Sequence, residues 1–362
     1  MNIKDRMIIE DFRRTRGDYL ELEGIVSEII GGIVKSSGIP VMGIEHRVKE
    51  EKSLAGKLAR SGDWYQKIED LMDLLGARII LYFADDVDRI GKLIEGAFVI
   101  DRQYSSDQRA MLDPNAFGYL SLHDICSLPT DKGYPERLTK IRFEIQIRSI
   151  LQHAWAQINH DMGYKSEFGV PRKVTREFAR LSGLLELADE EFIRARDHIN
   201  NYISETRARI MSDDAGDIPI DMVSLNEYML HNRKIRAFLT ELSEIEDSEI
   251  SEVDPESYIS QLAFLGIDTI GRLQEALERD RELALGLARR ALTGTGLDIL
   301  ASNVALRFLC RAELLLGGYS EDEAVGFIKL STSDPARAER QAKRLFSTYE
   351  KMKGIKEESE NG

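Results

Sequence analysis

The sequence is poor in cysteine, proline and tryptophan, which occur two, eight and two times among 362 residues. Its cysteines, Cys126 and Cys310, are far apart in the chain, so we expect neither a disulfide framework nor a cysteine zinc site and interpret both as core thiols. The chain also lacks an apolar signal-peptide core and any run near the roughly 18 apolar residues of a membrane span. These absences predict a cytoplasmic protein.

Positive charge is also scarce, since 49 Lys and Arg stand against 63 Asp and Glu, for a formal net charge of -14. This balance argues against broad non-specific nucleic-acid binding, which depends on neutralising phosphates with basic side chains, but it is compatible with a local basic pocket. Neither a GxxxxGK[ST] nor a GxGxxG motif is present, so any nucleotide is not held in the P-loop or Rossmann manner.

The length exceeds that of one usual domain, so we expect two. In the first, apolar residues at helical spacing over 7–36 predict one or two amphipathic helices. Strands are predicted at 77–83, 121–128 and 140–148, with a helix at 87–98. This order favours an α+β domain with a mixed, mainly antiparallel sheet flanked by helices.

A long helical pattern from 171 to 211 is followed by a Gly, Pro and Asp cluster at 212–219, which predicts a linker and a domain boundary near 215. We therefore expect domains 1–215 and 216–354, the second all-α and of unknown role. Further predictions are helices at 222–242, 257–264, 269–292, 297–316 and 334–353, an acidic loop at 244–256 and a disordered tail at 355–362.

Residues 143–149 carry the first chemical signal. Alternation places Glu144, Gln146 and Arg148 on one face of a strand and apolar residues on the other. A row of carboxylate, amide and guanidinium is costly to bury unless something polar lies against it, and a magnesium-phosphate ligand would satisfy all three. The pattern predicts a nucleotide site.

A dense basic run lies within 45–60 and contains Arg47, Lys49, Ser53 and Lys57. On a helix, the last three of these would line one face and could bind successive phosphates. The alternative interpretation is a solvated helix face.

Asp73 comes just before a predicted buried strand, where a carboxylate can hold magnesium. Gly76 would let the backbone approach a ligand closely. Arg78 needs a partner or a π surface, and a structural ion pair is its alternative.

Tyr119, Ser121 and His123 share one face where the next predicted strand begins. The tyrosine suits stacking on a base, and the other two suit hydrogen bonds to ribose or phosphate, although a strand edge with an exposed tyrosine has the same pattern. His153 and His160 follow on a predicted helix, where structural histidines are more common than zinc ligands.

In order and spacing these groups resemble the synthetase domain of the RelA/SpoT family over roughly residues 20–195. The family pattern R-x-K-x-x-x-S-x-x-x-K is similar to 47–57, D-x-x-G-x-R to 73–78, G-Y-x-S-x-H to 118–123 and E-I-Q-I-R-[ST] to 144–149. The chain as a whole resembles a small alarmone synthetase with a C-terminal helical extension. The family's hydrolase domain is not recognisable, so alarmone degradation is not expected.

The resemblance implies transfer of the β,γ-pyrophosphate of ATP to the ribose 3′-hydroxyl of GDP or GTP, which yields (p)ppGpp in the stringent response. It further implies magnesium (Mg²⁺) as cofactor and ATP and GDP or GTP as partners, and oligomers are common in the family. On the side of the donor, ATP, the resemblance implies that Arg47 and Arg78 sandwich the adenine and that Lys49, Ser53 and Lys57 hold the phosphates. It also implies that Asp73 and Glu144 bind magnesium.

On the acceptor side, the resemblance implies that Tyr119 stacks on guanine and that Glu144 also activates the 3′-hydroxyl. The other acceptor-binding residues it implies are Ser121, His123, Gln146 and His153. Residues 113–119 read DPNAFGY where many guanosine-using members have NPKxNGY, which departs from the family pattern on this side.

The altered loop keeps one alternative open, a toxin-like pyrophosphokinase acting on adenosine nucleotides or the tRNA 3′ end. A second alternative, from a different class, is an inactive nucleotide-sensing module. Retention of Asp73, Glu144 and Lys57 argues against an inactive site. A basic patch at the acceptor side would favour tRNA, and its candidate members are Arg102, Arg109, Lys132, Arg137, Lys140 and Arg142.

Overall fold

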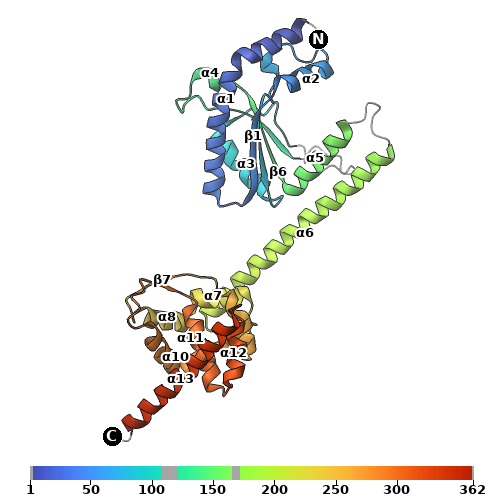
Figure 1. Ribbon diagram of the computed structural model, residues 1–362. Coiled ribbons are helices and arrows are strands. Elements are labelled where there is room, and N and C mark those ends of the chain that lie inside the picture. The colour runs from blue at the N-terminus through green and yellow to red at the C-terminus, as the bar shows by residue number, and fades with distance from the viewer. Residues whose placement is uncertain (1–2, 108–120, 165–171, 361–362) are drawn as a thin grey trace. The chain divides into compact units, whose positions relative to one another are not determined.

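The computed structural model describes residues 3–107, 121–164 and 172–360 (Figure 1). The chain divides into two compact units, Met1–Arg196 and Asp197–Gly362. This division falls inside one long helix, α6 (Arg172–Met211), which the sequence pattern predicts closely. The domain boundary near residue 215 therefore stays a prediction.

The described part of the first unit is built on a six-stranded mixed sheet. At its centre β2 (Leu75–Leu81) pairs in parallel with β6 (Phe143–Ser149) and antiparallel with β1 (Val41–Val48). On the other side of β6 lies β5 (Leu122–Ser127), again antiparallel. The short strands β3 (Val99–Ile100) and β4 (Ser106–Asp107) both pair antiparallel with β5. The predicted mixed, mainly antiparallel sheet is confirmed.

One face of the sheet forms the core of the first unit. Figure 1 shows α1 (Ile3–Ser37) and α3 (Asp86–Ala97) on one side of the strands and α5 (Ile150–Tyr164) on the other. At Gly91 of α3 an added Cβ would lie 2.9 Å from Leu122 Cδ2, so this helix approaches the sheet closely. The remaining short helices are α2 (Glu51–Ser61), η1 (Ile68–Asp70) and α4 (Glu136–Thr139).

Strand β1 was not among the predicted strands, and it corrects the helix considered for the basic run. Arg47 lies in the strand and Lys49 in the connection after it, so only Ser53 and Lys57 are on a helix, α2. As an edge strand, β1 pairs with β2 alone and stays largely accessible, so its sequence lacks the apolar alternation that reveals a buried strand.

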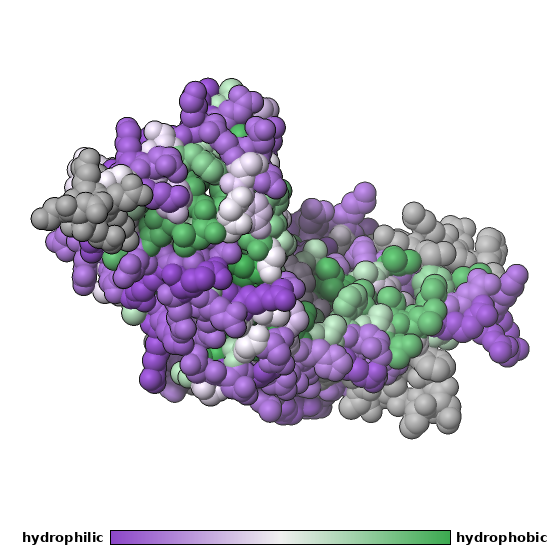
Figure 2. Space-filling model, turned by 90° about the horizontal axis from the view of Figure 1, so that it is seen from below, coloured by the Kyte–Doolittle hydropathy of each residue, from purple (hydrophilic) through white to green (hydrophobic). Residues whose placement is uncertain are grey.

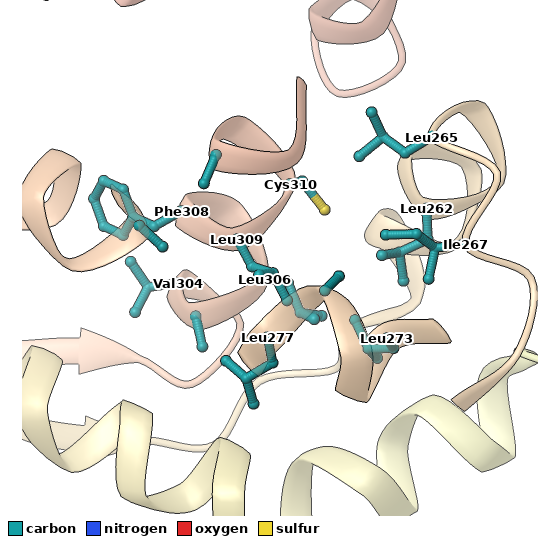
Figure 3. Close-up of a cluster of buried hydrophobic side chains, with 14 of the residues drawn as sticks. Leu262, Leu265, Ile267, Leu273, Leu277, Val304, Leu306, Phe308, Leu309 and Cys310 are labelled. Carbon is teal, nitrogen blue, oxygen red and sulfur yellow. The ribbon is translucent and has the colours of Figure 1, made fainter. Parts of the chain in front are cut away.

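The second unit is mainly helical, but the all-α prediction is corrected by a short parallel pair, β7 (Glu249–Ser251) with β8 (Ile299–Ala301). Strand β7 lies in the predicted acidic loop, and β8 replaces the start of the helix predicted at 297–316. Its core gathers around α10 (Ile270–Leu292) and α11 (Val304–Leu316), where Figure 3 shows Leu277, Leu306 and Leu309 among the buried side chains. The other elements are α7 (Met222–His231), α8 (Arg233–Ser243), η2 (Glu256–Tyr258), α9 (Ile259–Phe264), α12 (Glu321–Lys329) and α13 (Pro335–Glu360).

Three local differences from the sequence-based expectation have physical causes. The helix predicted at 222–242 breaks at Asn232, whose side chain accepts hydrogen bonds from Lys234 N and Ile235 N and so begins α8. Within the expected linker, Ala215 and Ile218 are buried in the core of the second unit. Helix α13 continues to Glu360, through most of the tail for which disorder is predicted.

Hydrophilic residues cover much of the face seen in Figure 2, with apolar areas between them. This surface agrees with a composition in which 31% of residues are charged. Among the described helices, none combines the length and the apolar character that a membrane crossing requires.

A close backbone contact in the second unit gives a stability prediction. At Gly271 an added Cβ would lie 2.5 Å from Gly216 O and 2.8 Å from Gly216 Cα, both backbone atoms that cannot turn away. We expect Gly271→Ala to lower the free energy of unfolding by about 1–3 kcal/mol, measured by urea denaturation followed by circular dichroism.

The matched control is Gly326→Ala in α12, where nothing lies within 4 Å of the added Cβ. That change should raise helix propensity and stabilise the chain by about 0.5–1 kcal/mol. Unfolding of Gly271→Ala at the same urea concentration as the wild type would contradict the close packing of α10 against the backbone of residue 216.

Candidate functional site

The face of the sheet opposite the core is polar. Strand pairing places Glu45 beside Arg78, and Arg78 beside Gln146 on the next strand. Since cross-strand partners project to the same side, these charged and amide groups converge there. They line a pocket of about 170 Å³ whose walls are Glu45, His46, Arg47, Lys49, Asp73, Gly76, Ala77, Arg78, Glu144 and Gln146.

Asp73 anchors one wall of this pocket. Lys57 Nζ lies 2.8 Å from its Oδ1, and Lys49 Nζ donates to its Oδ2. Burial raises the pKa of Asp73, but the two ammonium groups outweigh it and hold the pKa below its ordinary value. The same carboxylate raises the pKa of Lys57 against the effect of burial, whereas burial prevails at Lys49 and lowers its pKa. The wall therefore presents an ionised carboxylate between two basic groups.

Glu144 anchors the opposite strand through a hydrogen-bonded chain. Its Oε1 lies 2.8 Å from His123 Nδ1, and its Oε2 accepts from Gln146 Nε2 at 2.9 Å. Ser121 Oγ lies 2.8 Å from His123 Nε2, which fixes the ring from its far side. Burial raises the pKa of Glu144, but the bonds from His123 and Gln146 outweigh it and keep the pKa below its ordinary value. This carboxylate is thus also held ionised.

The amide of Gln146 connects the two arginines of the polar face. Its Oε1 accepts from Arg78 Nε at 3.2 Å and also from Arg148. Burial and the neighbouring Arg78 lower the pKa of Arg148 to about 10. Arg78 also pairs with Glu45 at 3.3 Å, so it makes the ion pair that was its alternative role while still lining the pocket.

A buried pair that the sequence did not reveal supports the end of β6. Ser149 Oγ donates to Asp189 Oδ2 of α6 at 2.8 Å, and Ser149 N donates to Gln152 Oε1 at 2.9 Å. Burial and the nearby Asp85 raise the pKa of Asp189 to about 7. Nothing in the local sequence marks Asp189, because its partner is distant along the chain.

Not every predicted site residue lies at the pocket. Ser53 is exposed on α2, and half-buried His153 lies on α5, where burial and Arg148 lower its pKa; neither lines the pocket. Tyr119 lies outside the described residues, as does the side chain of His160. Two residues near the site were not predicted from the sequence, Glu45 and Tyr65. The alternation of Glu45 with Arg47 along the strand is a signal that could have revealed Glu45. The centre of the Tyr65 ring lies 5.2 Å from Lys57 Nζ.

The candidate basic patch for tRNA is largely neutralised within the protein. Arg137 pairs with Glu21 at 2.7 Å and Arg142 with Asp101 at 3.2 Å. The other ion pairs are Arg102 with Glu95 and Lys140 with Glu136, whereas Lys132 is exposed and forms none among the described residues. Arg109 lies outside the described residues. These pairs remove most of the positive charge that a tRNA would need.

The residues present fit magnesium bound together with a nucleotide. Carboxylate oxygens suit a hard cation, and Mg²⁺ is usually held by one or two carboxylates together with substrate phosphates and water. Asp73 and Glu144 both line the pocket and both are ionised. Among the described residues no group of three or more His, Cys, Asp or Glu side chains could hold a metal ion.

Residues 46–168 match the family model described as a region found in RelA / SpoT proteins. This part of the first unit thus matches the RelA/SpoT family, and the resemblance seen in the motifs is confirmed. The match contains the pocket residues from His46 to Gln146 and ends before the second unit.

Among known proteins, the chain is similar to two from Bacillus subtilis (strain 168). GTP pyrophosphokinase YjbM is 27% identical over 164 residues, which are 44% of this chain and 74% of that protein. GTP pyrophosphokinase YwaC is also 27% identical over 164 residues, 44% of this chain and 76% of that protein. The crystal structure of small alarmone synthetase 1 from Bacillus subtilis aligns with a TM-score of 0.45 at 25% identity, over 53% of this chain and 99% of that one.

The buried Asp189 predicts a pH-dependent stability. Because its pKa rises from 3.8 to about 7 on folding, the folded chain keeps a proton there that the unfolded chain loses, and stability falls as the pH rises between these values. Asp189→Asn stays neutral and can still accept from Ser149. We expect it to be more stable than the wild type by about 1–3 kcal/mol at pH 8, and equal to it near pH 4, in urea denaturation.

The control is Glu186→Gln, an exposed carboxylate of the same helix, which should give no pH-dependent difference. A stability gain in Asp189→Asn that is the same at both pH values would contradict the buried protonated carboxyl.

Proposed function

We propose that this chain is a pyrophosphokinase that transfers the β,γ-pyrophosphate of ATP to the ribose 3′-hydroxyl of GDP or GTP, producing (p)ppGpp for the stringent response. The observation that carries the proposal is one pocket in which two ionised carboxylates, Asp73 and Glu144, lie with basic groups from β1, β2 and the turn between β1 and α2. The names of the two relatives, both GTP pyrophosphokinases, support the same reaction.

The donor side would use the basic groups around Asp73. Lys49 and Lys57 already carry charge against a carboxylate and would transfer these contacts to the ATP phosphates, whose negative charge must be neutralised during transfer. Arg47 lies on β1 across from Gly76, and Arg78 lies two residues after Gly76 on β2; the two would hold the adenine between their guanidinium planes.

Asp73 and Glu144 would hold the magnesium. When bound there, the ion neutralises charge on the phosphate chain and helps to fix its direction. The protein's own part is positional, since His123 and Gln146 orient Glu144 and the two lysines orient Asp73. Pyrophosphoryl transfer needs little covalent help beyond such placement.

The acceptor side would lie along β5 and β6. Ser121, His123 and Gln146 are joined to Glu144 and would contact the sugar and phosphates, while Tyr119 would stack on the guanine. An ionised Glu144 can accept the hydrogen bond of the 3′-hydroxyl and take its proton as the new P–O bond to the β-phosphorus forms and the bond to the leaving AMP breaks. The neutralised basic patch favours a small nucleotide over tRNA as acceptor.

The proposal is tested by incubating the chain with γ-labelled ATP and magnesium and offering GDP, GTP, ADP, ATP or deacylated tRNA separately. Label should move to GDP or GTP. Asp73→Asn and Glu144→Gln should each lower the rate by at least about 100-fold, because each removes charge at the reacting phosphates.

The control for these variants is Glu136→Gln, an exposed carboxylate of α4, which should keep wild-type rates. Label that reached only adenosine nucleotides or tRNA would refute the guanosine acceptor. Wild-type turnover by either carboxylate variant would remove that residue from the site.

The basic run offers a sharper test of the donor side, since helix α2 carries one lysine at Asp73 and one that is exposed. Lys57→Gln should raise the KM for ATP by about tenfold or more, because it removes a charged contact worth about 1.5–3 kcal/mol. Lys52→Gln on the same helix should leave KM within about twofold, as exposed charges contribute little.

Steady-state rates at saturating acceptor measure both variants. Equal losses in the two would mean that the helix contributes only general positive charge. Circular dichroism verifies that Lys57→Gln remains folded, because the change also removes one partner of Asp73.

A further inference from the structure

The second unit contains a recess lined by arginine. Two hollows of about 240 and 250 Å³ share Arg307, Arg311 and Gln341 in their walls, so they adjoin. We call the combined recess the arginine pocket, and its five arginines are Arg290, Arg307, Arg311, Arg337 and Arg344.

Helix geometry explains why these side chains converge. Arg307 and Arg311 are one turn apart on α11, so they project from the same face. Arg337 and Arg344 are seven residues apart on α13 and share its face in the same way, with Gln341 between them. Helix α10 adds Arg290, and all of these helices belong to one unit with one core.

The arginine pocket contains no carboxylate. No Asp or Glu is among the residues that line either hollow, and within the described residues none of the five guanidinium groups forms an ion pair. Other arginines of the same unit are paired, for example Arg279 with Glu313 and Arg236 with Glu252. A cluster of arginines without ion pairs is unusual in a chain that has 63 acidic residues.

Gathering these groups has an electrostatic cost. Burial, together with the nearby Arg307 and Arg344, lowers the pKa of Arg311 to about 10, and no carboxylate is among the groups that act on it. Arg311 is half-buried and the other four arginines are exposed, so the repulsion that an anion would relieve acts mainly on Arg311. A bound anion would therefore offset this unfavourable electrostatic free energy.

We propose that the arginine pocket binds a small oligophosphate anion, either pyrophosphate or the phosphate chain of a nucleotide. Guanidinium groups match phosphate oxygens in pairs, and two joined hollows give room for more than one phosphate. Neutral groups that can hydrogen-bond also line the recess, namely Tyr258, Gln341, Ser331, Thr332 and Thr348. The net charge of -14 disfavours a long nucleic acid as the occupant.

The test labels arginines in the full chain with phenylglyoxal and measures the rate at each residue by peptide mass spectrometry. Because each arginine is followed separately, binding at the synthetase pocket does not obscure the result. The probe is inorganic pyrophosphate, with ATP and GTP as further arms that show whether a nucleoside adds affinity. The two control arms are sodium chloride at matched ionic strength and an RNA oligonucleotide.

Pyrophosphate at about ten times its Kd should slow modification of Arg307 and Arg311 by about tenfold, since only the free fraction reacts. Arg289 is an exposed neighbour of Arg290 on α10 that does not line the recess, and its rate should not change. Equal slowing by sodium chloride, no slowing by pyrophosphate, or slowing by RNA alone would each overturn the proposal.

A variant pair separates binding from folding. In Arg311→Gln the protection of Arg307 by pyrophosphate should be lost, while in Arg289→Gln it should persist. Without pyrophosphate, Arg311→Gln should melt at or above the wild-type temperature, because it removes repulsion and breaks no ion pair. A large fall in melting temperature would show that Arg311 has a structural role instead. The test uses no transfer activity, so it can fail or succeed independently of the synthetase proposal.

Discussion

The parallel pairing of β2 with β6 is the constraint on which the candidate site depends. Its register sets Gly76 beside Glu144 and Arg78 beside Gln146, and the adjoining edge strand sets Glu45 beside Arg78. Because side chains alternate along a strand, a slip of one residue would turn these polar groups into the core and the apolar groups outward. The buried Phe143, on the other face of β6, therefore helps to fix the chemistry as well as the fold.

This dependence explains which parts of the site could be predicted from the sequence. Alternation in 143–149 predicts the polar face correctly, because β6 is central and buries its other face. Lys49 was misjudged as helical, because edge strand β1 before it has little apolar patterning and charge spacing alone also suits a helix. Asp189 could not be found at all, since its contact with Ser149 comes from packing between distant segments.

The second unit shows the same division between local and long-range information. Most of its helices follow from apolar periodicity, and even the missed α12 has a local signal, a capping box between Ser320 and Glu323. The five arginines of the arginine pocket are spread from 290 to 344 on three helices, and each alone looks like an ordinary surface residue. Only the packing of α10, α11 and α13 reveals that they converge without an acidic partner.

The two basic recesses differ in how their charge is balanced, and this difference predicts how each responds to phosphate. At the synthetase pocket, Asp73 already neutralises Lys49 and Lys57, so an incoming phosphate chain must replace their contacts with the carboxylate by contacts with phosphate and gains mainly in position. In the arginine pocket nothing is replaced, because Arg307 and Arg311 have no carboxylate partner in the part of the chain that the structure describes. Phosphate binding there would relieve repulsion directly, so the second unit should gain more stability from a bound anion than the first.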